Sequence, residues 1–224
     1  MDQWVIIWIL IIIGTALACL FIWLFYGNGI DKLKHPEEWK DAGSSGERAV
    51  YRTLIDDIHI PDNQILRNVY IPNSKGSTSE IDLLVVSKKG IFVFEVKNYG
   101  GKIYGDMKRQ KWIQYLGGKK TYFYNPFRQN KTHCENLQNL ISKYGEIPIV
   151  SLLTTIARGE WKVRNLKPED HFLGYNCHFK DIYNSMPICE QMSKSFKPIL
   201  ETLTPLSRPS DEIKEKHIAD HKRN

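Results

Sequence analysis

The strongest hydrophobic pattern in the chain is an uninterrupted apolar run at positions 4–26. These 23 residues contain no charged side chain, and a helix of about 20 apolar residues is long enough to cross a bilayer. Aromatic residues lie toward the ends of the run, where amphipathic rings favour the lipid headgroup region. The run therefore predicts a transmembrane helix, within a membrane anchor at residues 1–28.

Three other interpretations of this run were weighed. A cleavable signal peptide needs a basic N-terminal region and a shorter apolar core, but the only early charge is Asp2. A lipoprotein signal at residues 16–19 is disfavoured because the apolar run continues well past Cys19. A buried core helix is disfavoured by the length of the run at the extreme N-terminus. The membrane anchor is the favoured interpretation, with the bilayer as a partner of residues 4–26.

The flanking charges predict the orientation of the anchor. Lys32, Lys34 and Lys40 follow the run closely, whereas only an acid precedes it. By the positive-inside bias, the body of the chain lies in the cytoplasm of a single-pass cell-membrane protein. The four cysteines are scattered without a CxxC pair, which agrees with a reducing compartment.

Beyond the run, shorter hydrophobic patterns alternate with polar segments. Residues 29–45 are polar, with glycine and serine, as expected of a juxtamembrane linker. Apolar positions at helical spacing from Gly46 to Ile58 predict a first helix, and β-rich runs on either side of residues 87–90 predict a hairpin. Further strands are expected at 65–71, 102–104, 111–115, 119–124 and 147–154, and further helices at 129–144 and 181–196.

These elements predict an α/β domain at residues 46–160, an extension at 161–207 packed on it, and a charged tail at 208–224. The whole chain carries a net charge of +6. Asp2 is the only charged residue among the first 30, so the remaining 194 residues carry +7. A basic body suits a polyanionic partner, either nucleic acid or the anionic inner leaflet, and charge alone does not choose between them.

Candidate chemistry lies on the predicted hairpin. Alternate residues of a strand share a face, so Glu95 and Lys97 project to the same side. A hairpin closed through residues 88–89 places Asp82 opposite Glu95. Two facing carboxylates repel each other, and a divalent cation such as Mg²⁺ between them would relieve that repulsion. Lys97 is then placed to orient or deprotonate an attacking water, or to neutralise phosphate charge, as phosphodiester cleavage requires.

The order of these residues resembles the PD-(D/E)xK nuclease superfamily, and in detail the nuclease-related domain (NERD) family. Asp82 and Glu95-Val96-Lys97 carry the superfamily pattern, although Ile81 stands where its proline is usual. The resemblance covers roughly residues 43–155. The segments that match the family are Gly46-Glu47, Glu80-Ile81-Asp82, residues 90–98, Trp112-Ile113-Gln114 and residues 124–130.

The resemblance implies a restriction-endonuclease-like fold, in which a central mixed β-sheet is flanked by helices. It implies that Asp82 and Glu95 bind Mg²⁺ or Mn²⁺, and that Lys97 is the catalytic lysine. It further implies that Glu47 approaches the same metal, directly or through water. Gln114 matches a family position near the site whose role stays open.

Structural interpretations compete with each of these roles. The three hairpin residues also suit an ion-pair network on a solvated strand face, and Glu47 suits the first turn of any helix. His171, Cys177 and His178 lack the spacing of a tetrahedral metal site. Aromatic and basic residues interleave between positions 99 and 133, which suits either nucleic-acid binding or ordinary strands and helix surfaces. The candidates for nucleic-acid contact are Lys102, Tyr104, Arg128, Gln129 and His133.

The favoured hypothesis is a membrane-anchored, metal-dependent nuclease that hydrolyses phosphodiester bonds, and the expected substrate is DNA. The alternative is a catalytically silent module that tethers nucleic acid or a protein at the inner face of the membrane, within a protein complex there. A third hypothesis is an adaptor whose basic body contacts anionic lipid. The sequence predicts no oligomeric state.

Overall fold

The computed structural model describes residues 14–15, 42–73, 76–156, 159–173 and 179–207. The predicted transmembrane run apart from residues 14–15, most of the linker and the charged tail lie outside these residues. Among the described helices, none is both long enough and apolar enough to cross a membrane.

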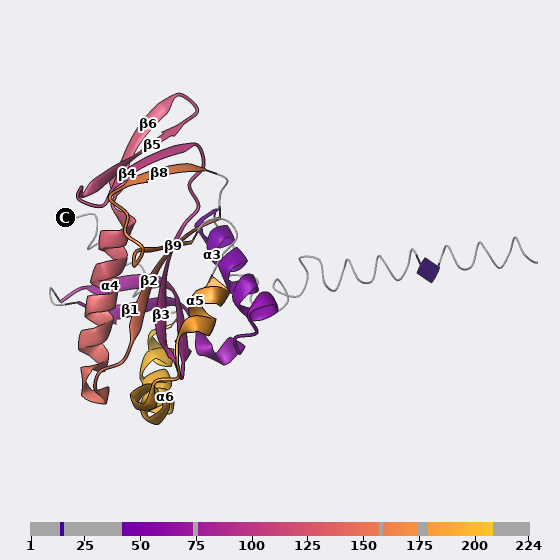
Figure 1. The fold of residues 1–224 in the computed structure, drawn as a ribbon, viewed down its shortest axis with the longest axis vertical. Helices are drawn as coiled ribbons and strands as arrows, with labels where there is room; N and C mark the ends of the chain where they lie inside the picture. Colours follow the sequence, from indigo (N-terminus) through magenta and orange to yellow (C-terminus); the bar gives the residue numbers. More distant parts are fainter. Residues whose placement is uncertain (1–13, 16–41, 74–75, 157–158, 174–178, 208–224) are drawn as a thin grey trace, which may run out of the picture. The chain divides into compact units, whose positions relative to one another are not determined.

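A five-stranded sheet forms the core, with the strand order β1-β2-β3-β7-β9 (Figure 1). The first three strands pair antiparallel, whereas β7 and β9 run parallel to β3, so the sheet is mixed. Its strands are β1 (Ile65–Pro72), β2 (Thr78–Ser87), β3 (Gly90–Lys97), β7 (Ile149–Thr155) and β9 (His171–Leu173).

Helices cover both faces of this sheet. On one face, α4 (Pro126–Ile141) and α6 (Glu190–Leu203) share a buried cluster with Ile91 and Val93 of β3. On the other, α5 (Phe179–Ser185) places Phe179 edge-on to Phe92 and Phe94, and α3 (Ala42–Arg52) approaches the end of β3. The expected α/β architecture, a mixed sheet flanked by helices, is confirmed.

A second sheet of four strands, in the order β6-β5-β4-β8, was not anticipated as a separate unit (Figure 1). A cluster of aromatic rings joins its inner face to the rest of the domain. Its strands are β4 (Lys102–Asp106), β5 (Lys111–Leu116), β6 (Lys119–Tyr124) and β8 (Glu160–Arg164). The rings are Tyr99, Trp112, Phe123, Phe127, Trp161 and Phe172.

The expected elements before residue 160 are present, with shifts of a few residues at their ends. After α3, one π-helical turn, Thr53–Asp57, extends the first helix as predicted. After residue 160 the predictions were poorer. The single helix expected at 181–196 is wrong, because α5 ends at Ser185 and α6 begins at Glu190, on either side of Pro187. The strands β8 and β9 were missed.

Candidate active site

Glu95 is a buried carboxylate at the end of β3. Only 1% of its side chain is exposed. Lys97 Nζ lies 2.5 Å from Oε1 and His133 Nε2 lies 3.3 Å from Oε2. Beyond these two ion-pair contacts, neither oxygen accepts a hydrogen bond from the described residues. Such a carboxylate keeps lone pairs available for a further ligand.

Asp82 occupies an irregular point in β2. The predicted hairpin register is confirmed for five pairs, from Ser87 with Gly90 to Leu83 with Phe94, but the ladder goes no further. On the other side of β2, the ladder with β1 skips Asp82 and the facing residue Asn68, whose φ is 48°. The expected regular pairing of Asp82 with Glu95 is therefore wrong.

Instead of a strand partner, Asp82 takes a backbone donor from β3. The N–H of Val96 donates to Asp82 Oδ2 at 2.7 Å. A side chain thus supplies the acceptor where the ladder between β2 and β3 has ended. Asp82 and Glu95 repel each other here, as the sequence predicted. They are brought together by the hydrogen bond from Val96 and not by regular strand pairing.

The electrostatics show how closely the charged groups are gathered. Burial raises the pKa of Asp82 well above its usual range, and repulsion by Glu95 and Glu47 raises it further, against the pull of Lys97. Burial tends to lower the pKa of Lys97, but attraction by Glu95 and Asp82 outweighs burial, and the pKa is raised. Three carboxylates therefore share one neighbourhood with one lysine.

Gly46 explains how α3 brings Glu47 into that neighbourhood. A Cβ at Gly46 would lie 3.2 Å from Cγ1 of Val96 and 3.3 Å from Cβ of Asn98, so the missing side chain lets α3 approach the end of β3. Glu47, the next residue, is half-buried. Its part in metal binding stays a prediction.

His133 belongs to the site in a way that the sequence did not indicate. It is 6% exposed, so it lies neither on a solvated helix surface nor where nucleic acid could contact it directly. Its Nδ1 lies 2.7 Å from Ser79 Oγ while Nε2 faces Glu95. The available signal was the apolar stripe of α4, because Leu137 and Ile141 continue backward through His133 at helical spacing.

The other sequence candidates are dispersed. Gln114, on β5, donates from Nε2 to the carbonyl of Gly100 at 2.9 Å, and so fixes the connection that follows Lys97. Lys102 and Tyr104 are exposed on β4, and Gln129 is half-buried on α4.

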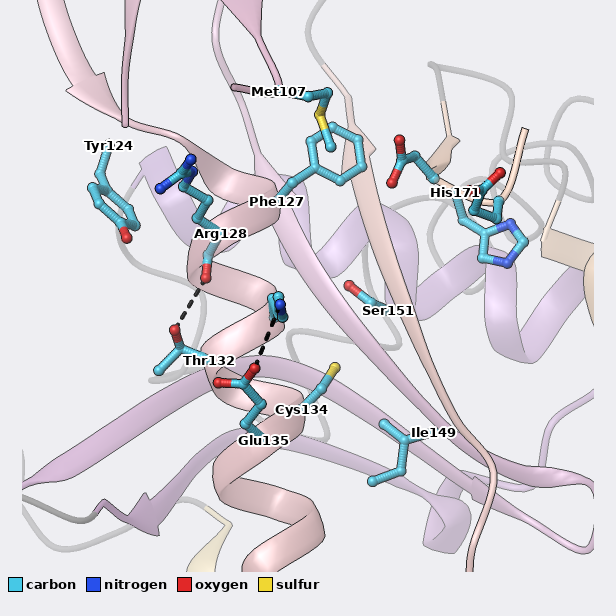
Figure 2. Close-up of a pocket in the computed structure, with 13 residues that line it drawn as sticks. Met107, Tyr124, Phe127, Arg128, Thr132, Cys134, Glu135, Ile149, Ser151 and His171 are labelled. Atoms are coloured by element: carbon cyan, nitrogen blue, oxygen red, sulfur yellow. Dashed lines mark hydrogen bonds and ion pairs between the residues drawn. The ribbon is translucent and has the colours of Figure 1, made fainter. Parts of the chain in front are cut away.

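Arg128 lies at a pocket of about 690 Å³ between α4 and the strands β7 and β9 (Figure 2). The pocket lining carries both charges, with Arg128 and Lys131 beside Glu135, Glu169 and Asp170. Asp82, Glu95 and Lys97 do not line it, so this pocket is separate from the carboxylate site.

The carboxylate site offers few ligands for a divalent cation. Within the described ranges, no group of three or more His, Cys, Asp or Glu side chains is arranged to hold a metal ion. Mg²⁺, however, is commonly bound by one or two carboxylates, with water and phosphate completing its shell. The lone pairs that remain on the oxygens of Glu95 and the repulsion at Asp82 fit such a two-carboxylate site.

Comparison with known proteins shows the family of the chain. Residues 42–156 match the family model described as nuclease-related domain, NERD, which confirms the resemblance drawn from the motifs. An uncharacterized protein of Bacillus anthracis is 31% identical over 186 residues, which cover 83% of this chain and 85% of that protein. No solved structure matches the chain.

Proposed function

Because the chain belongs to the nuclease-related domain family, we propose that it is a metal-dependent nuclease that hydrolyses phosphodiester bonds of DNA. The observation that carries the proposal is that the buried Glu95 and the partly buried Asp82 lie together beside Lys97. A buried, mutually repelling carboxylate pair is costly to a fold that gains nothing from it. Perturbed charges of this kind gather at functional sites.

Asp82 and Glu95 would hold Mg²⁺ or Mn²⁺, with Glu47 within reach directly or through water. Such an ion, when bound, polarises the phosphate and makes a coordinated water a better nucleophile. In the hydrolysis, the oxygen of water bonds to phosphorus and the bond from phosphorus to the leaving sugar oxygen breaks. One proton of the water goes to solvent and the leaving oxygen gains a proton.

The protein's own groups contribute position and charge. Lys97 is held by Glu95 at 2.5 Å, where its ammonium would orient the water or stabilise charge that develops on the phosphate. His133 contacts the other oxygen of Glu95 and is itself fixed by Ser79. We assign His133 the part of a positioning residue, which fixes the rotamer of a ligand in the way that outer-shell partners do.

One observation favours a catalytically silent domain as the second candidate. Glu95 contacts two side chains that can carry positive charge, so its own charge is partly compensated without a metal ion. A binding module with this arrangement would hold nucleic acid or a protein without hydrolysis. Asp82 is the residue that this candidate leaves unexplained.

We also propose that residues 4–26 anchor the enzyme in the cell membrane with the domain in the cytoplasm. The support is the run of 23 uncharged residues and the lysines that follow it. A reporter fused after Asn224 should report the cytoplasm, and an external reading would contradict the proposed orientation.

Cleavage assays with the full chain in mild detergent test the enzymatic proposal. Linear duplex DNA, circular DNA, single-stranded DNA and RNA would be incubated with Mg²⁺, Mn²⁺ or EDTA. Glu95→Gln and Lys97→Ala should each lower cleavage by at least about a hundred-fold. Glu190 offers a control, because it is an exposed carboxylate on α6 whose Oε1 lies 2.7 Å from Nζ of Lys194.

Glu190→Gln should leave cleavage unchanged. Cleavage that requires a divalent cation and fails in both site variants would support the nuclease. A folded wild-type chain that cleaves none of the four substrates, but binds them regardless of Glu95, would contradict it and favour the silent module.

A further inference from the structure

The outward face of the second sheet carries an unusual set of side chains. Alternation along β4, β5 and β6 turns Trp112 and Phe123 inward, to the aromatic cluster, and turns the intervening residues outward. Four tyrosines occupy the outward face and stay substantially exposed: Tyr104 at 39%, Tyr115 at 40%, Tyr122 at 57% and Tyr124 at 43%. We call these residues and the cations beside them the tyrosine face.

Positive charge is interleaved with these rings. The strand register places five cations on the tyrosine face and two acids, Asp106 and Glu160. Each acid is ion-paired with a neighbouring cation, Arg164 at 3.5 Å and Lys162 at 2.8 Å. The excess positive charge therefore comes from the remaining cations, which are Lys102, Lys111 and Lys120.

Rings and cations are close enough to act together. Lys120 Nζ lies 5.0 Å from the ring centre of Tyr122 and 5.9 Å from that of Tyr115. Lys162 Nζ lies 5.9 Å from the ring centre of Tyr104, and the rings of Tyr104 and Tyr115 are 5.7 Å apart. Flat rings with adjacent ammonium groups repeat across neighbouring strands.

We propose that the tyrosine face binds single-stranded nucleic acid. Unpaired bases would stack on the exposed rings while the lysines contact the phosphates between them, as in known single-strand-binding surfaces. A duplex does not suit this face, because its bases are already stacked on one another and are not free to stack on the tyrosine rings. DNA and RNA share the stacking and phosphate chemistry.

The charge pattern favours nucleic acid over a lipid surface. Insertion into a bilayer needs protruding apolar side chains, whereas cations surround the rings here and the large aliphatic side chain that stands out, Leu116, is confined to the tip of the β5–β6 hairpin. At its end near α4, the face continues to a pocket. Tyr124 belongs to both, and Arg128 lies beside it there (Figure 2).

This binding site is separate from the carboxylate site. The inward rings of the second sheet stand between the tyrosine face and the rest of the domain. The inference therefore does not rest on the proposed cleavage, and a catalytically silent domain would have the same binding face.

Fluorescence anisotropy with the full chain in detergent and EDTA tests the proposal without cleavage. The probes are labelled oligo(dT), oligo(rU) and a DNA duplex, each of about 20 nucleotides, a length that spans a typical site. Oligo(dT) should bind more tightly than the duplex. Tyr122→Leu should weaken binding of the single strands about ten-fold, whereas Tyr122→Phe, which keeps the ring, should stay within about two-fold.

A charge variant gives a second readout. Lys120→Ala should make the slope of log affinity for oligo(dT) against log salt concentration shallower by the equivalent of about one phosphate contact. Lys194 is exposed on α6, and Lys194→Ala should leave that slope unchanged. Unchanged single-strand binding in both Tyr122→Leu and a combined Tyr115→Leu, Tyr122→Leu variant would overturn the proposal and leave lipid as the partner of this face. An equal loss of affinity for the duplex and for the single strands in these variants would also overturn it. Failure of cleavage alone would not, since binding is measured in EDTA.

Discussion

Asp82 is a side chain whose charge the fold accommodates poorly. Burial and the negative charge of Glu95 both raise its pKa, and the N–H of Val96 and Lys97 compensate only in part. Because its pKa is raised, Asp82 binds a proton more tightly in the folded protein than in the unfolded chain. Its contribution to the free energy of unfolding is therefore largest at low pH. The folded protein loses this contribution as the pH rises through the raised pKa of Asp82.

Asp82→Asn should therefore stabilise the metal-free protein at pH 7, by about 1 kcal/mol. The asparagine oxygen can still accept from Val96 while the repulsion disappears. The gain should shrink toward pH 4, where the aspartate is itself protonated. Chemical denaturation in EDTA measures the change, with Asp57→Asn, at an exposed position, as a control expected within about 0.5 kcal/mol. Destabilisation at pH 7 would contradict the description of Asp82.

His133 is expected to act through Glu95. His133→Ala should weaken binding of Mn²⁺ about 10- to 100-fold, the range found for residues that orient metal ligands. Thermal shift against Mn²⁺ concentration measures this affinity. His171→Ala, in the pocket on the other side of β7, should leave it unchanged, and equal effects of the two substitutions would argue against a positioning role.

The order of Asp82, Glu95 and Lys97 along the chain was enough to make them candidates, and the structure brings them together. The sequence named His133 only as a candidate for nucleic-acid contact, and it did not identify Asn68. The importance of these two residues comes from Glu95 and Asp82, which lie 38 and 14 positions away, respectively. The order alone is also not decisive, since Glu160-Trp161-Lys162 repeats the Glu-x-Lys pattern at an exposed position.

Among the strands, the ladder between β2 and β3 breaks at Asp82. The predicted register is therefore right up to Leu83 and wrong at Asp82. The tight turn at residues 87–90 determines the pairing as far as Leu83. Beyond it, Ile81 and Leu84 pack in the same buried cluster although simple alternation would place them on opposite faces. The change of face occurs at Asp82 and Asn68, and an asparagine with positive φ is not a signal that can be read reliably from sequence.

The second sheet depends on the close contact between Gly105 and Trp112. A Cβ at Gly105 would lie 2.6 Å from the indole ring. Gly105→Ala should therefore cost about 2 kcal/mol through overpacking. Gly100→Ala is the control, because its Cβ would come no closer than 3.9 Å to Leu116. Thermal denaturation compares the two, and equal melting temperatures would show that the sheet adapts freely.

Across the molecule, the C-terminal residues complete structures that begin much earlier. Residues 161–207 contain most of β8, which pairs with β4, and all of β9, which pairs with β7. Met192, Ile199 and Leu203 of α6 enter the main buried cluster. The segment matched by the family model, residues 42–156, is therefore smaller than the unit that folds.

A chain ending at residue 160 should fail to fold, whereas one ending at residue 207 should fold like the full chain. The shorter chain loses the edge strands of both sheets and the apolar face of α6, which leaves a large hydrophobic surface exposed. Size-exclusion chromatography and near-ultraviolet circular dichroism distinguish the two. A monodisperse, cooperatively unfolding product ending at residue 160 would contradict this expectation.

The α/β class and the mixed sheet could be predicted because strong local periodicity and the family motifs coincide before residue 160. The division into two sheets could not. The pairings that create it are long-range: β4 pairs with β8 across the whole of α4 and β7. Short strands such as β9, with three residues, carry too little local pattern to indicate their partner.

The most direct test of the account is Mn²⁺ binding, measured by electron paramagnetic resonance as the loss of free-ion signal. The wild-type chain should bind Mn²⁺ at a specific site, with Mg²⁺ in competition. Asp82→Asn and Glu95→Gln should each abolish that binding, while Glu160→Gln should retain it. Binding that is absent from the wild type, or equal in all four proteins, would show that Asp82 and Glu95 do not hold a metal ion.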